Sequence, residues 1–264
     1  MNNATALPSL FLSHGAPTLA LADSLTGRFL DALGLALPRP RAIVIASAHM
    51  NAARPVLNAN PAPATLHDFG GFPRELYALR YPAPGAPELA LRAGTLLRGA
   101  GFDAATDAAA PIDHGVWVPL RRMYPAADIP VVALSVNPAR DAAWHTALGA
   151  ALAPLRDEGV LVIGSGGFVH NLGALDWHGD DRPTAPWASG FADWMERHVA
   201  AGDVAAAQAW RTQAPQALSA HPTSEHLLPL FVAWGAAGGR GQRLHAAWEL
   251  GTLALHAFRF DGAA

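Results

Sequence analysis

The number and placement of the histidines in this chain indicate a possible metal-binding or catalytic site. The 264 residues include twelve histidines and no cysteine, which excludes thiolate zinc sites, iron–sulfur clusters, disulfides and cysteine nucleophiles. A metal bound here must therefore use nitrogen and oxygen ligands, and imidazole suits zinc, copper and iron. A metal centre built from histidines is the first chemistry to consider.

Three histidines stand at or just beyond the ends of short apolar runs. His14 follows "SLFLS", His49 ends "IVIASAH", and His170 lies a few residues after "VLVIG". Apolar runs without polar alternation are typical of strands that are covered on both faces. Because ligands in open α/β sheets collect at the carboxyl ends of the strands, we expect these imidazoles to meet in one crevice.

Two more histidines are placed at expected helix starts. His114 in "PIDHGVWVPL" opens an expected helix that the side chain of Asp113 would cap. His226 in "HPTSEHLLPL" is expected in the first turn of a helix, where the helix dipole favours the neutral, metal-binding form of imidazole. His221 and Glu225 stand beside it as alternative or supporting ligands. A lone histidine in any of these places is more often a packing residue, so only the five histidines taken together indicate a metal site.

The elements that must position these side chains alternate along the chain. This alternation predicts an α/β fold, and the lack of internal repeats or composition breaks predicts one domain over residues 1–264. Strands are expected at residues 9–13, 42–48, 129–136 and 160–164, and helices at 23–37, 87–99, 140–157, 189–201, 204–213 and 225–236. Residues 51–88 are so rich in proline and glycine that we expect mostly loop, either a binding loop or an ordered surface loop.

The composition limits the possible partners and location. Hydrophobic residues make up 51% of the chain, charged residues 15%, and the formal charge is -3, which favours a compact soluble protein over a nucleic-acid binder. No segment has the length of a membrane span or the basic start of a signal peptide. We therefore expect a cytoplasmic protein that contacts neither nucleic acid nor membrane, as a monomer or small homo-oligomer.

Seven short motifs occur in order from about Pro8 to the C-terminal "HAFRFDG": "LFLSHGAP", "SAHM", "HDFGGFPRELY", "YPAPGAPELA", "DHGVWVPL", "GSGGFVHNL" and "HPTSEHLLPL". Each motif alone is weak, but the ordered set resembles the class III extradiol ring-cleavage dioxygenases, in the branch similar to 4,5-DOPA dioxygenases. The resemblance implies a single-domain α/β fold with a central mixed, largely parallel sheet flanked by helices, and one mononuclear divalent metal in a cleft.

The resemblance also implies roles for individual histidines. It implies that His14, His49 and His226 bind the metal. His170 would be either a further ligand or the acid–base residue, and His114 would face the substrate. Related extradiol enzymes use a glutamate as the third ligand, so Glu225 remains an alternative to His226. Consecutive helical residues point about 100° apart, so both are not expected to bind one ion.

The chemistry implied is the opening of a small, DOPA-like catechol by O₂ beside the diol, which gives a muconic semialdehyde. Iron(II) would support the activity, although zinc is possible as the bound ion, and either 2,3 or 4,5 opening remains possible. We assign the proton steps first to His170 and second to His114, because the pKa of histidine lies near working pH. The alternatives are a zinc-dependent hydrolase on the same histidines and a non-catalytic binding protein.

The proline- and glycine-rich loop supplies candidate substrate contacts. Phe72, or else Phe69 or Tyr77, is expected to stack on the aromatic ring, and Arg74 or Arg80 to meet a substrate carboxylate. Core packing explains the aromatic residues of this loop equally well.

Overall fold

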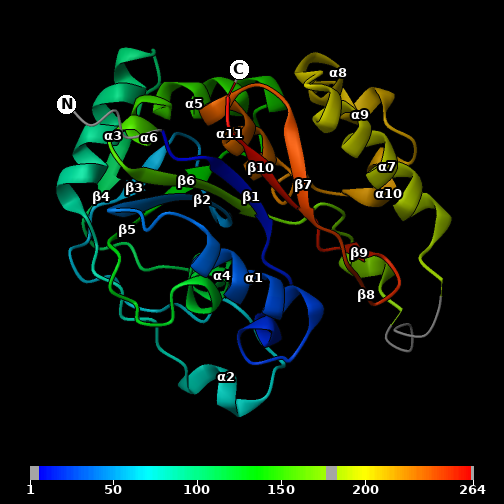
Figure 1. Ribbon diagram of the computed structural model, residues 1–264, viewed down its shortest axis with the longest axis horizontal. Helices are drawn as coiled ribbons and strands as arrows, with labels where there is room; N and C mark the ends of the chain where they lie inside the picture. Colours follow the sequence, from blue (N-terminus) through cyan, green and yellow to red (C-terminus); the bar gives the residue numbers. More distant parts are fainter. Residues whose placement is uncertain (1–5, 177–182, 263–264) are drawn as a thin grey trace.

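The computed structural model describes residues 6–176 and 183–262, and within these ranges the chain forms an eight-stranded mixed sheet (Figure 1). Its strand order is β4-β3-β5-β2-β6-β1-β10-β7. The strands are β1 (Ser9–Ser13), β2 (Ala42–Asn51), β3 (Val56–Asn58), β4 (Ala105–Asp107), β5 (Val131–Val136), β6 (Val160–Gly166), β7 (Gly241–His245) and β10 (Ala257–Phe260). A separate pair contains β8 (Trp248–Glu249) and β9 (Leu253–Ala254).

The centre of the sheet is parallel and its margins are mixed. Strands β5, β2, β6 and β1 all run in one direction, whereas β10 and β7 pair antiparallel on one side and β3 pairs antiparallel with β5 on the other. The predicted α/β fold with a mixed, largely parallel sheet is confirmed. Because β1, β2 and β6 are parallel, their carboxyl ends lie at one edge of the sheet.

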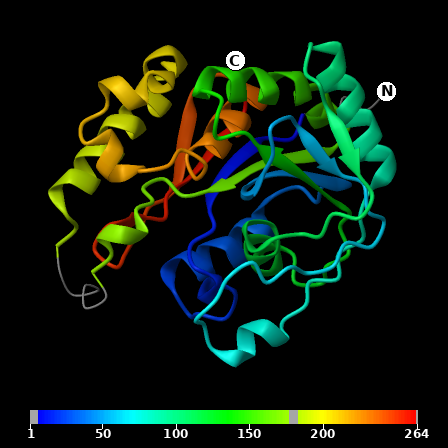
Figure 2. The same ribbon diagram turned by 180° about the vertical axis from the view of Figure 1, so that it is seen from behind.

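Alternation along each central strand divides its side chains between the two faces. Ile43 and Ile45 of β2 join one buried cluster, whereas Val44 and Ala46 join another. Figures 1 and 2 show helices on both faces of the sheet. The first face is covered by α1 (Leu25–Ala36) and α4 (His114–Met123), and the second by α3 (Pro87–Gly99), α5 (Ala142–Leu152) and α11 (Leu228–Ala237).

A third buried cluster lies beside β1 and β10, where aromatic rings dominate the packing. It includes Phe11, Phe231 and Phe258 from the sheet and α11. The helices that complete it are α7 (Pro186–Ala201), α8 (Val204–Gln208), α9 (Trp210–Gln213) and α10 (Ala217–Ala220). No helix in the described part of the chain combines the length and hydropathy needed to cross a bilayer.

Several predicted boundaries differ from the structure. The helix expected over residues 140–157 is two helices, α5 and α6 (Pro154–Asp157), because Pro154 has no N–H to continue the first one. The helix expected over 204–213 is divided into α8 and α9. Strand β2 continues past residue 48 to Asn51, so His49 lies within the strand rather than after it.

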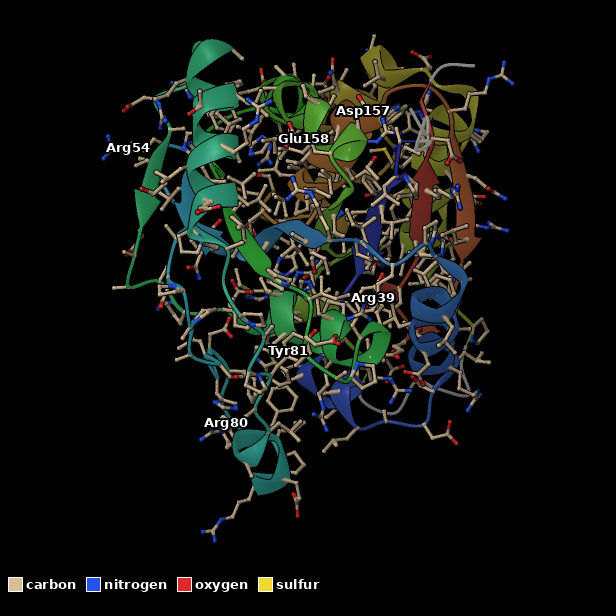
Figure 3. The ribbon with its side chains drawn as sticks, turned by 60° about the vertical axis from the view of Figure 1, so that its left-hand side comes forward. Arg39, Arg54, Arg80, Tyr81, Asp157 and Glu158 are labelled. Atoms are coloured by element: carbon tan, nitrogen blue, oxygen red, sulfur yellow. The ribbon has the colours of Figure 1, made fainter. Side chains whose placement is uncertain are left out.

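The proline- and glycine-rich segment is mostly irregular, as predicted, with β3 and α2 (Arg74–Ala78) as its regular elements. It is nevertheless held against the body of the protein. The buried Tyr81 donates a hydrogen bond to the carbonyl oxygen of Tyr124 at 3.1 Å, and Asn58 donates to the carbonyl oxygen of Ala110 at 2.9 Å. In Figure 3, Arg80 lies at α2 on the outer side of this segment, while Tyr81 lies closer to the helices of the core.

His145 is a buried histidine whose neutral form is required by its hydrogen bonds. Its Nε2 accepts from the backbone N–H of Asn137 at 3.1 Å, and its Nδ1 lies 2.8 Å from the carbonyl oxygen of Asp141. Burial lowers its pKa to about 4, although the hydrogen bond to the backbone of Asp141 acts in the opposite direction and raises the pKa. This residue holds the turn between β5 and α5 and acts as a structural histidine.

We expect His145 to make the protein less stable in mild acid. Its folded pKa lies below the value of about 6.5 for an unfolded chain, so the unfolded state binds more protons between these values. The stability that His145 contributes is complete above pH 6.5 and falls by about 1.4 kcal/mol per pH unit toward pH 4. Urea unfolding of the metal-free protein at pH 7 and pH 5 measures this slope. His145→Gln should flatten it, and equal slopes in both proteins would contradict the assignment.

Candidate metal centre

A cavity of about 840 Å³ lies at the carboxyl edge of the sheet. Its lining includes all five histidines singled out in the sequence, which are His14, His49, His114, His170 and His226. They come from the ends of β1 and β2, the start of α4, the loop after β6 and the turn before α11. The strand ends and helix starts that position them are separated in sequence but meet at this edge.

His14 is held in one orientation by a buried serine. It follows β1, and Gly15 turns the chain immediately after it with a φ of 61°, a conformation that favours glycine. The hydroxyl of Ser165 donates its proton to the carbonyl oxygen of Gly115, so at 3.0 Å it accepts from Nδ1–H of His14. The Nε2 atom of His14 is therefore unprotonated.

His49 faces His14 from β2, where the pairing with β5 is irregular between Ser47 and Asn51. Its Nδ1 lies 3.5 Å from Oδ2 of Asp68, and its Nε2 lies 3.0 Å from Nε2 of His14. With the Nδ1 proton toward the carboxylate, two nitrogen lone pairs face each other at this short distance. Burial, followed by repulsion from His114, lowers the pKa of His49 to about 3. A metal cation near both nitrogens would remove the repulsion between the lone pairs.

His226 completes the group from the turn before α11. The sequence placed it in the first turn of this helix, but that prediction is wrong because the helix begins at Leu228. Its Nδ1 lies 3.1 Å from Oε1 of Glu225, which also accepts from Oγ1 of Thr223 at 2.8 Å. Within the described part of the chain, its Nε2 is buried without a hydrogen-bond partner. The carboxylate of Glu225 therefore supports the back of the His226 ring, and Nε2 is left for a ligand.

These donors fit a divalent metal. One nitrogen from each of His14, His49 and His226 lies within 4.8 Å of the other two. Burial lowers the pKa values of His14 and His226 well below the usual range, so the rings are neutral and competent to bind metal at neutral pH. Each ring also uses its other nitrogen to contact a serine or carboxylate oxygen, an arrangement that orients metal-binding histidines. Three such ligands on one side leave positions for substrates.

His170 lies beside this group rather than in it. Its ring stacks on that of His226 with centroids 3.5 Å apart and planes 6° from parallel. It is absent from the metal-competent groups found among residues 6–176 and 183–262. Its backbone N–H donates to the carbonyl oxygen of Ala220 at 3.0 Å, and burial lowers its pKa to about 4. A parallel ring at this distance can exchange protons with a substrate without binding the same ion.

Asp68 is a site residue that the sequence analysis missed. Its Oδ1 accepts from the backbone N–H of His114 at 3.0 Å. The cap expected from Asp113 is wrong: that side chain makes no cap bond and instead accepts from Oγ of Ser47 at 2.6 Å. Burial raises the pKa of Asp113 to about 6. The signal available in the sequence was an aspartate within "HDFGG", but its partner lies 46 residues away.

Gly115 lets the start of α4 approach β2. A Cβ atom at this position would lie 2.5 Å from Oγ of Ser47 and 3.2 Å from Cδ2 of His49. Any larger side chain would therefore press on His49 itself. The carbonyl oxygen of Gly115 also accepts from Ser165, the residue that orients His14. Gly115 thus leaves room for the ring of His49, and its carbonyl oxygen holds the serine that orients His14.

Of the predicted substrate contacts Phe72 and Arg74, only Phe72 lines the cavity. Phe72 lines the cavity together with Phe69. Arg74 is exposed at the start of α2 and is not among the residues that line the cavity. The remaining lining of the cavity is largely apolar and includes Leu172, Leu175, Trp248, Leu253 and Leu255.

Comparisons with known proteins agree with the observed fold. The LigB family, described as the catalytic LigB subunit of aromatic ring-opening dioxygenase, matches residues 10–254. A protein of Beta vulgaris named 4,5-DOPA dioxygenase extradiol is 42% identical over 258 residues, covering 96% of each chain. A protein of the same name from Escherichia coli K12 is 42% identical over 250 residues, covering 90% of this chain and 88% of its own.

A solved structure extends the agreement to three dimensions. The crystal structure of an uncharacterised protein from Escherichia coli K12 aligns with a TM-score of 0.81 at 38% identity, covering 96% of this chain and 99% of its own. The family match spans most of the chain, and the relatives match it over nearly their full lengths. The chain therefore belongs to the LigB family of aromatic ring-opening dioxygenases, and it is an extradiol dioxygenase, an oxidoreductase.

Proposed function

We propose that this enzyme opens the ring of a small, DOPA-like catechol beside the diol to give a muconic semialdehyde. His14, His49 and His226 would hold one iron(II) ion. The observation that carries the proposal is the convergence of three oriented, neutral imidazoles in one cavity. The names of the two 4,5-DOPA dioxygenase relatives support a DOPA-like substrate.

Bound iron(II) would supply the one-electron chemistry that allows O₂ to react with a catechol. The protein would bind the catechol in the cavity, with Phe72 against the ring and the apolar wall limiting the access of water. His170 and His114 both line this cavity, so either ring can reach a catechol hydroxyl there. One histidine would take a hydroxyl proton as the catechol binds, and a histidine would return a proton to an oxygen atom derived from O₂ as the O–O bond breaks.

Oxygen consumption by defined metal forms tests this proposal. Metal-free protein is reloaded without air with either iron(II) or zinc(II) and mixed with L-DOPA, protocatechuate or catechol. We expect oxygen uptake and a yellow product only with iron. Absence of uptake with every catechol at full iron occupancy would overturn the proposal and would favour a zinc-dependent hydrolase. We further propose a cytoplasmic enzyme with one catalytic domain over residues 1–264, as a monomer or small homo-oligomer.

A further inference from the structure

Asp68 connects the proline- and glycine-rich loop to two histidines of the cavity. Its Oδ1 lies 3.0 Å from the backbone nitrogen of His114 and 2.9 Å from Nδ1 of the same residue, while its Oδ2 lies 3.5 Å from Nδ1 of His49. The side chain of His114 is 7% exposed and that of Asp68 is 20% exposed. One carboxylate therefore contacts a metal-site histidine and a second histidine that faces the substrate.

The contact with Asp68 dominates the surroundings of the Nδ1 atom of His114. Apart from Oδ1 of Asp68, no hydrogen-bonding group in residues 6–176 and 183–262 pairs with this buried nitrogen. The 2.9 Å contact lies outside the ideal hydrogen-bond direction, so its attraction is mainly electrostatic. It favours a proton on Nδ1, and Nε2 is then the nitrogen left for a substrate.

The loop that carries Asp68 is itself fixed to α4. Trp117 of α4 donates from Nε1 to the carbonyl oxygen of Leu66 at 2.9 Å, and the N–H of Leu66 donates to the carbonyl oxygen of Ile112 at 2.8 Å. The ring of Phe69 meets that of His114 edge-on, with centroids 5.6 Å apart and planes at 89°. The carboxylate thus approaches His114 from a segment anchored on both sides.

We infer that Asp68 is a positioning residue that fixes the ring of His114 with Nδ1–H toward the carboxylate and Nε2 available to the catechol. This inference rests on the proposed function. In the proton step, the catechol O–H bond breaks with its electron pair remaining on oxygen, and an N–H bond forms at Nε2 of His114. The negative charge of Asp68 stabilises the resulting imidazolium.

A competing interpretation makes Asp68 a metal ligand. His49, Asp68 and His114 form a second group whose donor atoms lie within 4.8 Å of one another. The carboxylate of Asp68, however, already accepts from the backbone of His114 and contacts the Nδ1 side of both rings. A positioning residue and a ligand differ in the consequence of losing the charge: at saturating iron(II), only loss of a ligand removes the metal.

The test combines Asp68→Asn with His114→Gln and the double variant, all loaded with iron. We expect Asp68→Asn to lower kcat by about 10- to 100-fold, with KM for the catechol and the metal content at saturating iron(II) unchanged. The double variant should be no slower than His114→Gln, because a positioning residue acts only through the residue it orients. Glu75→Gln, an exposed change in the same loop, should match the wild type. Additive losses, an unchanged kcat or loss of metal from Asp68→Asn at saturating iron(II) would each overturn the inference.

A second readout does not depend on turnover. In the zinc-loaded protein, ¹⁵N NMR of the His114 ring should show the proton on Nδ1, and Asp68→Asn should change this tautomer population. A wild-type ring protonated at Nε2, or an Asp68→Asn ring unchanged from wild type, would overturn the inference even if no catechol is cleaved. Absence of turnover in the wild type would count against the proposed function alone.

Discussion

Replacement of His226 by alanine is expected to remove the bound metal and abolish catechol-dependent oxygen uptake. The ring supplies a buried Nε2 that has no hydrogen-bond partner among residues 6–176 and 183–262, so its loss leaves two imidazoles and an open coordination position. The activity should fall by more than about 10³-fold, beyond the 10- to 100-fold loss typical of a residue that only supports a ligand. Metal content by elemental analysis and oxygen uptake, measured on the same iron-loaded sample, check this result.

The matched control is the neighbouring carboxylate. Glu225→Gln keeps an oxygen that can accept from Nδ1 of His226 but loses the charge, so metal affinity should fall by about 10- to 100-fold and saturating iron should restore activity. Circular dichroism of both variants verifies that the fold is intact. Loss of metal in Glu225→Gln together with full metal in His226→Ala would exchange the roles of the two residues.

Replacement of His170 by alanine should slow ring opening by about 10²- to 10⁴-fold, the usual contribution of a general acid–base group. The catechol affinity should change only a few-fold, because His170 stacks on His226 outside the candidate ligand group. Catechol binding can be measured without air, after which mixing with oxygen in a stopped-flow instrument gives the rate of ring opening. This order separates substrate binding from the chemical step.

A second histidine variant controls for general effects of the substitution. His198 lies on α7 beside Asp203 and does not line the cavity, so His198→Ala should retain the wild-type rate and metal content. If His170→Ala instead loses metal and activity to the same extent, His170 is a metal ligand, and the return of a proton during ring opening also belongs to His114.

The sequence alone determined the fold class and which histidines would meet. The apolar runs of β1 and β6 are buried at every position, so their lack of polar alternation was sufficient to identify central strands. Helix boundaries were predicted least well where two short helices follow each other, as in α5 and α6, because their apolar spacing continues across the break. Once the strands are parallel, histidines at their carboxyl ends must share an edge of the sheet.

Only the tertiary structure decided which atoms of those histidines face one another. The orientation of His14 depends on Ser165, which is 151 residues away, and that of His114 depends on Asp68 from a loop with little regular structure. Such contacts have no local periodicity, so no pattern in the sequence indicates them. The choice between His226 and Glu225 as the metal ligand likewise depends on the turn before α11. The two residues are adjacent and both have suitable chemistry, so only the course of the backbone decides which side chain faces the other histidines.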